Sequence, residues 1–184
     1  MLPLASADPA GVVVYVGTLS KVLAPGLRVG YLVASPDLIE RIAAVRSLLD
    51  IQGDLAMDAA VADLIDDGEL QRHVARTRRI YAERRNILAA ALRRELGEAA
   101  EFRVPNGGMA LWVRFPGLVD VEAWARRSVE RGVWWYTGKR YAFDQSAKPF
   151  ARFSFAWLNE RELPEAVRRL ASATPPQARS NRGR

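Results

Sequence analysis

Two aliphatic hydroxyl groups, a lysine and an arginine lie close together in the segment Gly17–Tyr31, between two runs of β-forming residues. Thr18 and Ser20 can donate hydrogen bonds from their hydroxyl groups, and the guanidinium of Arg28 can offer parallel N–H groups to an anion such as phosphate. Lys21 adds a primary amine, which is a nucleophile in its neutral form. The segment therefore predicts an anion-binding loop that contains a reactive amine.

Lysine is rare in this chain. Only Lys21, Lys139 and Lys148 are lysines among the 27 basic residues, and the others are arginines. A guanidinium cannot replace an amine in nucleophilic chemistry because it does not deprotonate in proteins. We expect Lys21 to be buried beside Arg28, an arrangement that would favour the neutral amine. The alternative is a solvated lysine in a surface loop.

The composition is that of a soluble globular protein with an ordinary core, since 49% of the residues are hydrophobic. The first residues lack the basic and apolar regions typical of a signal peptide, and no apolar run has membrane-spanning length, so we expect a cytoplasmic protein that does not enter a membrane. The absence of cysteine excludes disulfides and thiolate chemistry. The net charge is +6, but Arg179, Arg182 and Arg184 near the C-terminus carry three of these charges, so nucleic-acid binding by the folded part is only weakly indicated.

Two strands and three helices are expected around the lysine loop. The strand at residues 12–16 lacks polar alternation, a pattern typical of a strand covered on both faces, and a second strand is expected at 28–33. Helices are predicted over 36–49, 55–65 and 69–96. The last of these would be about 40 Å long, which is enough to span two lobes.

After residue 100 the pattern changes to short strands that alternate with helices, which predicts an α+β lobe. The expected strands are 102–104, 109–115, 133–136 and 152–156, and the expected helices are 120–131 and 160–171.

The amino-acid sequence around Lys21 resembles a known family signature. The sequence LAPGLRVGY at residues 23–31, with Lys21 just before it, is similar to the lysine motif of the class I/II aminotransferases, which have fold type I and depend on pyridoxal 5′-phosphate. It looks most like aminoadipate-type aminotransferases and winged-helix regulators of the GntR/MocR type. The resemblance extends to about residue 171.

The resemblance implies an α/β fold that is the C-terminal portion of a fold-type I pyridoxal phosphate-dependent transferase. Residues 1–78 would be a remnant of the large cofactor-binding domain with part of its sheet. Residues 79–173 would be the α+β small domain, which begins within the long interdomain helix. Residues 174–184 would be a disordered basic tail.

The resemblance also assigns a role to each of five residues. Lys21 would form the aldimine with pyridoxal 5′-phosphate and carry protons once the substrate has replaced it. Thr18, Ser20 and Arg28 would hold the cofactor phosphate. Arg152 would bind the substrate carboxylate; without the resemblance, an arginine that pairs with a nearby acid is the more common arrangement.

Other candidates are interpreted as structural. His73 is expected on the surface of the long helix, and the arginines of that helix are expected to form a solvated face. The Gly107-Gly108 pair matches a turn of the family's small domain and is an equally good ordinary β-turn. The five tryptophans are interpreted as packing residues and not as a platform for a cofactor. No acidic pair or histidine cluster has metal-site spacing, so no metal is expected.

The chain begins about ten residues before the strand that leads to Lys21, whereas the family has most of its large domain ahead of the lysine. The resemblance places there the acid that pairs with the pyridine nitrogen and the aromatic residue that stacks on the ring. We therefore expect a fragment that is not a competent aminotransferase alone and that leaves apolar strand edges open. The full-length family implies a homodimer.

Three functions remain open from the sequence. The first is amino-group transfer between an amino acid and a 2-oxo acid. The second is effector sensing in a pyridoxal phosphate-dependent transcriptional regulator, in which nucleic acid would be bound through an upstream domain that this chain does not contain. The third is a basic nucleic-acid-binding module without a cofactor, with affinity that falls steeply as salt rises.

Overall fold

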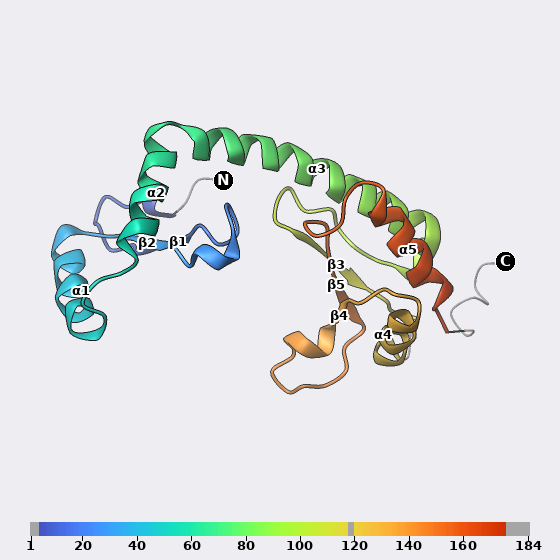
Figure 1. Ribbon diagram of the computed structural model, residues 1–184. Helices are drawn as coiled ribbons and strands as arrows, with labels where there is room; N and C mark the ends of the chain where they lie inside the picture. The colour runs from blue at the N-terminus through green and yellow to red at the C-terminus, as the bar shows by residue number, and fades with distance from the viewer. Residues whose placement is uncertain (1–3, 118–119, 176–184) are drawn as a thin grey trace. The chain divides into compact units, whose positions relative to one another are not determined.

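The computed structural model of this chain describes residues 4–117 and 120–175 (Figure 1). The chain divides between Arg76 and Thr77 into two compact units, which we describe separately. The basic tail expected at 174–184 lies outside the described residues from 176 onward. Among the described residues, no helix combines the length and the apolar composition that a membrane crossing requires.

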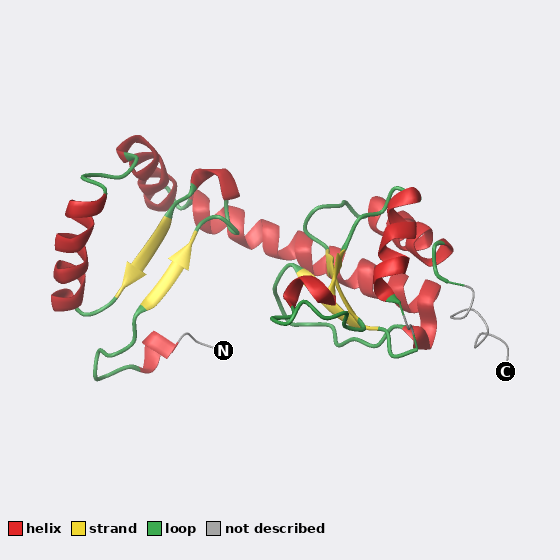
Figure 2. Cartoon of the chain, turned by 90° about the horizontal axis from the view of Figure 1, so that it is seen from below, coloured by secondary structure: helices red, strands yellow, loops and turns green. Residues whose placement is uncertain are grey.

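The N-terminal unit contains a two-stranded antiparallel ribbon, in which β1 (Tyr15–Thr18) pairs with β2 (Gly30–Val33). The two strands run in opposite directions in Figure 2. Short 3-10 turns, Leu4–Ala7 and Pro25–Leu27, precede β1 and interrupt the loop between the strands.

The expectation that the first strand is covered on both faces is wrong for this chain. Val16 is 72% exposed and Val33 is 55% exposed, and among the described apolar residues of this unit only Leu19 and Val61 are buried. Two strands and their flanking helices enclose too little volume to cover both faces of the ribbon. Among the described residues the ribbon has no third strand, so β1 and β2 each keep one unpaired edge, as the sequence led us to expect.

Helices α1 (Pro36–Leu49) and α2 (Leu55–Asp66) follow the ribbon. The side chain of Asp54 caps α2 because its carboxylate accepts a hydrogen bond from the Met57 amide at 3.0 Å. Helix α3 (Glu69–Leu96) begins in the N-terminal unit and continues into the C-terminal unit. Its bounds are those expected from the sequence.

The C-terminal unit is built on a three-stranded antiparallel sheet with the order β3-β5-β4. Strand β5 (Phe150–Ser154) is central, and β3 (Ala110–Arg114) and β4 (Tyr136–Thr137) flank it. Helices α4 (Val121–Glu130) and α5 (Glu162–Ser172) complete the unit together with the second half of α3, and further short 3-10 turns lie at Gly97–Ala99 and Gly138–Tyr141.

One face of this sheet packs on the helices and forms the core. Trp124 of α4 is fully buried, meets the rings of Phe115 and Trp135 edge-on at 4.9 and 5.1 Å, and donates from its indole nitrogen to the Leu170 carbonyl at 3.0 Å. The buried members of this core also include Leu88, Leu92, Leu111, Val113, Ala151, Phe153, Phe155, Leu163 and Val167.

The five tryptophans differ in burial. Trp124 and Trp135 are buried, but Trp112, Trp134 and Trp157 are 44%, 66% and 88% exposed. The expected strand at 102–104 is also absent, and a single bridge between Glu101 and Arg114 takes its place. The strand expected at 133–136 overlaps the observed strand only at Tyr136, because Tyr136 and Thr137 are the two residues that pair with β5 there.

Candidate functional site

The loop between β1 and β2 is organised by the Thr18 side chain. Its hydroxyl donates to the Val29 carbonyl at 3.3 Å and accepts from the Ser20 amide at 3.1 Å. The Leu19 amide also donates to Val29, at 3.0 Å, which closes the base of the loop. Thr18 therefore shapes the backbone that carries Ser20 and Lys21, a local turn that threonine supports well.

Lys21 follows Ser20 in a tight turn, in which the amides of Val22 and Leu23 donate to the Leu19 carbonyl at 3.0 and 2.8 Å. The Lys21 side chain is exposed, so the expectation of a buried amine is wrong for this chain. Burial would require neighbours on the open side of the ribbon, and the two strands do not supply them. Within the described residues the Lys21 amine makes no hydrogen bond or ion pair, so it is accessible to a ligand.

Arg28 lies at the other end of the loop, directly after the Pro25–Leu27 turn. Its backbone is in the left-handed region, with φ 55° and ψ 22°, which costs a residue with a Cβ roughly 1 kcal/mol. Its side chain is exposed and forms no hydrogen bond or ion pair in the part of the chain that is described. The strained backbone holds this unpaired guanidinium at the end of the loop that begins with Thr18.

Gly17 allows an aromatic side chain to lie across the start of the loop. It is paired with Tyr31 in the ribbon, and any Cβ added to Gly17 would collide with the Tyr31 ring. Tyr31 in turn lies 6.0 Å from the Tyr15 ring, and its hydrogen bond with Tyr15 is the main cause that raises the Tyr31 pKa. A glycine is thus required here for packing rather than for an unusual backbone angle.

His73 connects the start of α3 to the lysine loop. Its Nε2 lies 3.0 Å from the Val22 carbonyl, which can only accept, so Nε2 carries the proton in this hydrogen bond. The His73 side chain is half-buried and contacts the lysine loop, whereas the sequence led us to expect a residue on the helix surface. No sequence signal could have identified this contact, because the two residues are 51 positions apart.

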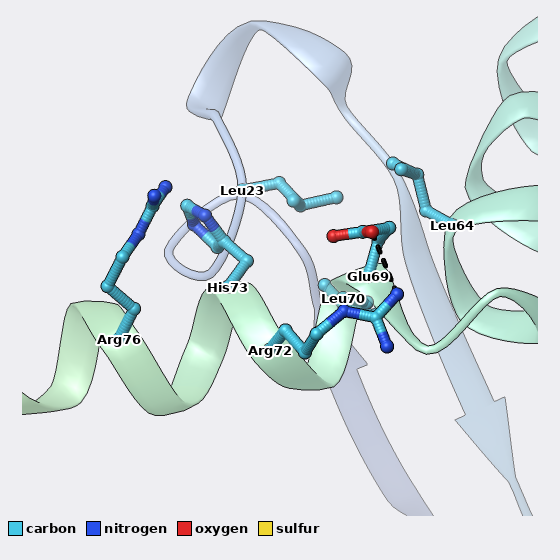
Figure 3. A pocket seen from close by; sticks show the side chains of 7 residues that line it. All are labelled: Leu23, Leu64, Glu69, Leu70, Arg72, His73 and Arg76. Carbon is cyan, nitrogen blue, oxygen red and sulfur yellow. Dashed lines mark hydrogen bonds and ion pairs between the residues drawn. The ribbon is translucent and has the colours of Figure 1, made fainter.

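A hollow of about 540 Å³ lies where the loop meets α3 (Figure 3). Figure 3 shows His73 and Arg76 pointing from α3 toward the loop that carries Leu23. Arg72 is engaged with Glu69 at 2.7 Å, and this hydrogen bond and charge lower the Glu69 pKa, with a smaller contribution from Arg76. The lining combines three leucines with polar and charged side chains: Leu23, Leu64, Leu70, Glu69, Arg72, His73 and Arg76.

Arg152 lies in the C-terminal unit, in the middle of β5. Its neighbours Ala151 and Phe153 are buried, so Arg152 projects from the face of the sheet opposite the core. Within the described residues its half-buried side chain makes no hydrogen bond or ion pair, so the common alternative of an arginine paired with an acid is not what the structure contains.

The donors of the lysine loop suit a phosphorylated aldehyde. The Lys21 amine can bond to an aldehyde carbon, and the Ser20 hydroxyl and the Arg28 guanidinium are donors suited to a phosphate. Residues 4–117 and 120–175 contain no group of three or more His, Cys, Asp or Glu side chains placed to hold a metal ion.

Comparison with known proteins defines the family. Residues 2–170 match the family described as aminotransferase class I and II, and this chain belongs to that family. It is 32% identical to the 2-aminoadipate transaminase of Thermus thermophilus, over 88% of this chain and 40% of that protein. It is also 32% identical to a probable rhizopine catabolism regulatory protein, MocR, of Rhizobium meliloti, over 90% of this chain and 34% of that protein.

A solved structure gives the same result for the fold. The α-aminoadipate aminotransferase LysN of Thermus thermophilus, complexed with N-(5′-phosphopyridoxyl)-L-leucine, superposes with a TM-score of 0.81 at 30% identity, over 92% of this chain and 43% of LysN. The fold-type I architecture and the likeness to both aminotransferases and MocR-type regulators are thereby confirmed. The chain spans less than half the length of each of these proteins.

Proposed function

We propose that this chain binds pyridoxal 5′-phosphate through the β1–β2 loop and contributes to amino-group transfer between an amino acid and a 2-oxo acid. The observation that carries the proposal is the set of side chains that this loop presents. An accessible amine on Lys21 lies in the same short loop as the Ser20 hydroxyl and the unpaired Arg28 guanidinium. The phosphopyridoxyl compound bound by LysN supports the choice of cofactor.

Each residue of the loop has a separate task in this proposal. When bound, the cofactor supplies an electron-withdrawing ring that makes the substrate Cα proton acidic. Lys21 provides the amine that would hold the cofactor, and once the substrate amine has displaced it, its free Nζ can accept or return that proton. Ser20 and Arg28 hold the phosphate, and Thr18 holds the Ser20 amide in place, a positioning role in addition to any contact with the phosphate.

Arg152 is proposed to bind the α-carboxylate of the substrate through its guanidinium fork. A carboxylate accepts two parallel N–H bonds from such a fork, which fixes its plane as well as its position. The absence of an acidic partner for Arg152 among the described residues supports this role. The proposal concerns binding by this chain; the relatives that transfer amino groups are more than twice as long.

A second candidate function is effector sensing, which the likeness to the MocR regulator favours. In that case Lys21 and Arg152 would bind the same ligands, and the result would be a conformational change without turnover. A cofactor-free nucleic-acid module is not favoured, because several helix arginines pair with acids of their own helix. These pairs are Arg72–Glu69, Arg94–Glu95, Arg168–Glu165 and Arg169–Glu165.

Spectroscopic titration tests the proposal. Adding pyridoxal 5′-phosphate to the purified chain is expected to produce a saturable visible absorption band that differs from that of the free aldehyde. Lys21→Ala should remove the band, whereas Lys139→Ala should leave it unchanged. A band that persists in Lys21→Ala, or no band at any concentration of the cofactor, would show that the loop is not the cofactor site.

A further inference from the structure

The C-terminal unit presents a second surface of unusual composition, on the face of its sheet opposite the core. In β3 the residues Leu111 and Val113 are buried, whereas Trp112 between them is 44% exposed. In β5 the same alternation places Arg152 on the open face. A large aromatic side chain and an arginine thus share this face.

Strand pairing places these side chains in one row. Arg152 is directly opposite Trp112 on one side and directly opposite Tyr136 on the other. Directly opposite residues on one face have Cβ atoms roughly 5 Å apart, so the Arg152 side chain emerges between the two aromatic rings.

Further rings extend this row into an arc. Tyr141, from the turn that follows β4, meets Trp112 edge-on at 5.2 Å and Tyr136 edge-on at 6.3 Å. Phe150 also stacks on Trp112, with ring centres 5.7 Å apart and 20° between the ring planes. We call Phe150, Trp112, Tyr141 and Tyr136 the aromatic arc, and Arg152 lies within it.

Arg152 differs from the other basic residues near this face in its surroundings. Arg114 also lies on the open face, but it pairs with Glu101 at 3.0 Å, and Lys148 pairs with Asp144 at 3.5 Å. The Cζ atom of Arg140 lies 4.3 Å from the centre of the Tyr136 ring. Arg152 is half-buried and has no anionic partner in the described residues, so it is the charge on this face best placed to bind one.

We propose that the aromatic arc and Arg152 form a binding site for a carboxylate that carries an aromatic ring. The guanidinium would bind the carboxylate bidentately, and the exposed faces and edges of Trp112 and Tyr141 would contact the ring of the ligand. This inference deepens the proposed function, since Arg152 is the residue proposed to hold the substrate carboxylate. It names the substrate class as aromatic amino acids and aromatic 2-oxo acids.

Exposed aromatic rings beside arginines can also stack nucleic-acid bases, but the charge pattern favours a small carboxylate. A single strand needs several free cations along its path, and here Arg114 and Lys148 are already neutralised. Arg140 has no ion pair among the described residues either, but its guanidinium is exposed and lies over the Tyr136 ring. Arg152 is the half-buried guanidinium inside the arc, and it matches one carboxylate with one apolar group.

Calorimetric titration of the full chain without cofactor tests this inference. The probe is 3-phenylpropionate, which has no amine or keto group and cannot react with Lys21 or a cofactor, and propionate is the reference. We expect 3-phenylpropionate to bind about tenfold more tightly than propionate, a difference typical of burying a ring. Arg152→Gln should abolish binding of both, and Trp112→Leu should remove most of the preference for the ring.

Two control variants change an arginine and a tryptophan of the same unit that have no part in the proposed carboxylate site. Arg114→Gln lies on the same face but removes a charge already paired with Glu101, and Trp157→Leu removes an 88% exposed tryptophan outside the arc. Both should bind 3-phenylpropionate like the parent chain. If Trp112→Leu lowers Tm, Tyr141→Leu in the exposed turn provides a second test of the arc.

Equal affinity for the two probes, full binding in Arg152→Gln, or tight salt-sensitive binding of an oligonucleotide that competes with 3-phenylpropionate would each overturn the inference. The cofactor-binding role proposed for Lys21 is tested by a different measurement, so its failure can be distinguished from a failure of the carboxylate site. If Lys21 does not bond to pyridoxal 5′-phosphate but the ring preference depends on Trp112 and Arg152, the carboxylate site stands without the cofactor loop. If the cofactor binds but the probes do not discriminate, the aromatic substrate class is wrong.

Discussion

The Nε2 atom of His73 lies 3.0 Å from the carbonyl oxygen of Val22, so the first turns of α3 hold the loop that carries Lys21. This contact joins the long helix to the candidate cofactor site within one unit of the chain. We expect His73→Ala to weaken cofactor binding about fivefold, because a hydrogen bond of this kind contributes roughly 1 kcal/mol to the ordered loop. The visible titration measures this change. Gln71→Ala, at an exposed position of the same helix, is the control and should bind like the parent; if both variants bind normally, the loop does not depend on His73.

Gly17→Ala should disturb the start of the loop, because its Cβ would collide with the Tyr31 ring. The ring must then leave its place beside Gly17, at a cost of about 1–3 kcal/mol. We expect a lower Tm for the N-terminal unit and weaker cofactor binding. Gly26→Ala is a matched control in the same loop, since nothing lies within 4 Å of its added Cβ. Similar effects of the two substitutions would contradict the special role of Gly17.

Acid should weaken the C-terminal unit through Glu165. Hydrogen bonds from Arg168 and then Arg169, both at 2.7 Å, lower the pKa of Glu165 from 4.5 to about 2. Because the folded pKa is the lower one, the stabilisation is present in full above the unfolded value and is lost as the pH falls from about 5 toward 2. Thermal melts over this range should therefore show a smaller loss of Tm in Glu165→Gln than in the parent chain. Glu130→Gln, at an exposed position with no ion pair in the described structure, should retain the parent's pH dependence.

Trp124→Leu should destabilise the C-terminal unit by about 3 kcal/mol, because it leaves a cavity between Phe115 and Trp135 and removes the donor to the Leu170 carbonyl. Urea unfolding followed by circular dichroism measures the loss. Trp157→Leu is the matched control and should change the free energy of unfolding by less than about 0.5 kcal/mol, because that side chain is exposed. Equal losses in the two variants would mean that the core is not centred on Trp124.

Features that depend on local chemistry were predictable from the sequence. Asp54 and Asp120 stand directly before two of the predicted helices and cap them, with carboxylate oxygens that accept from amides at 3.0 and 2.7 Å. Asn159 also caps the last helix, since its side chain accepts from the Glu162 amide at 3.0 Å, although the regular helix starts two residues later than expected. Hydrophobic periodicity and capping depend on residues within one turn of each other, which a sequence displays directly.

Features that depend on distant residues were not predictable. The length of β4 depends on how many residues reach β5, and the exposure of Lys21 depends on what covers the ribbon. The contact of His73 with Val22 has no sequence signal of its own. The aromatic arc was also missed, because Trp112, Tyr136 and Arg152 meet only through the register of three strands.

The most direct test of the central claim is to trap the bound cofactor on the chain. The full chain is incubated with pyridoxal 5′-phosphate, reduced with borohydride, digested and mapped by mass spectrometry. Because the chain has only three lysines, the assignment is unambiguous. We predict that the phosphopyridoxyl label lies on Lys21 in near-stoichiometric amount, and that Arg28→Gln reduces the labelling. A label found mainly on Lys139 or Lys148, or spread equally over all three lysines, would contradict it.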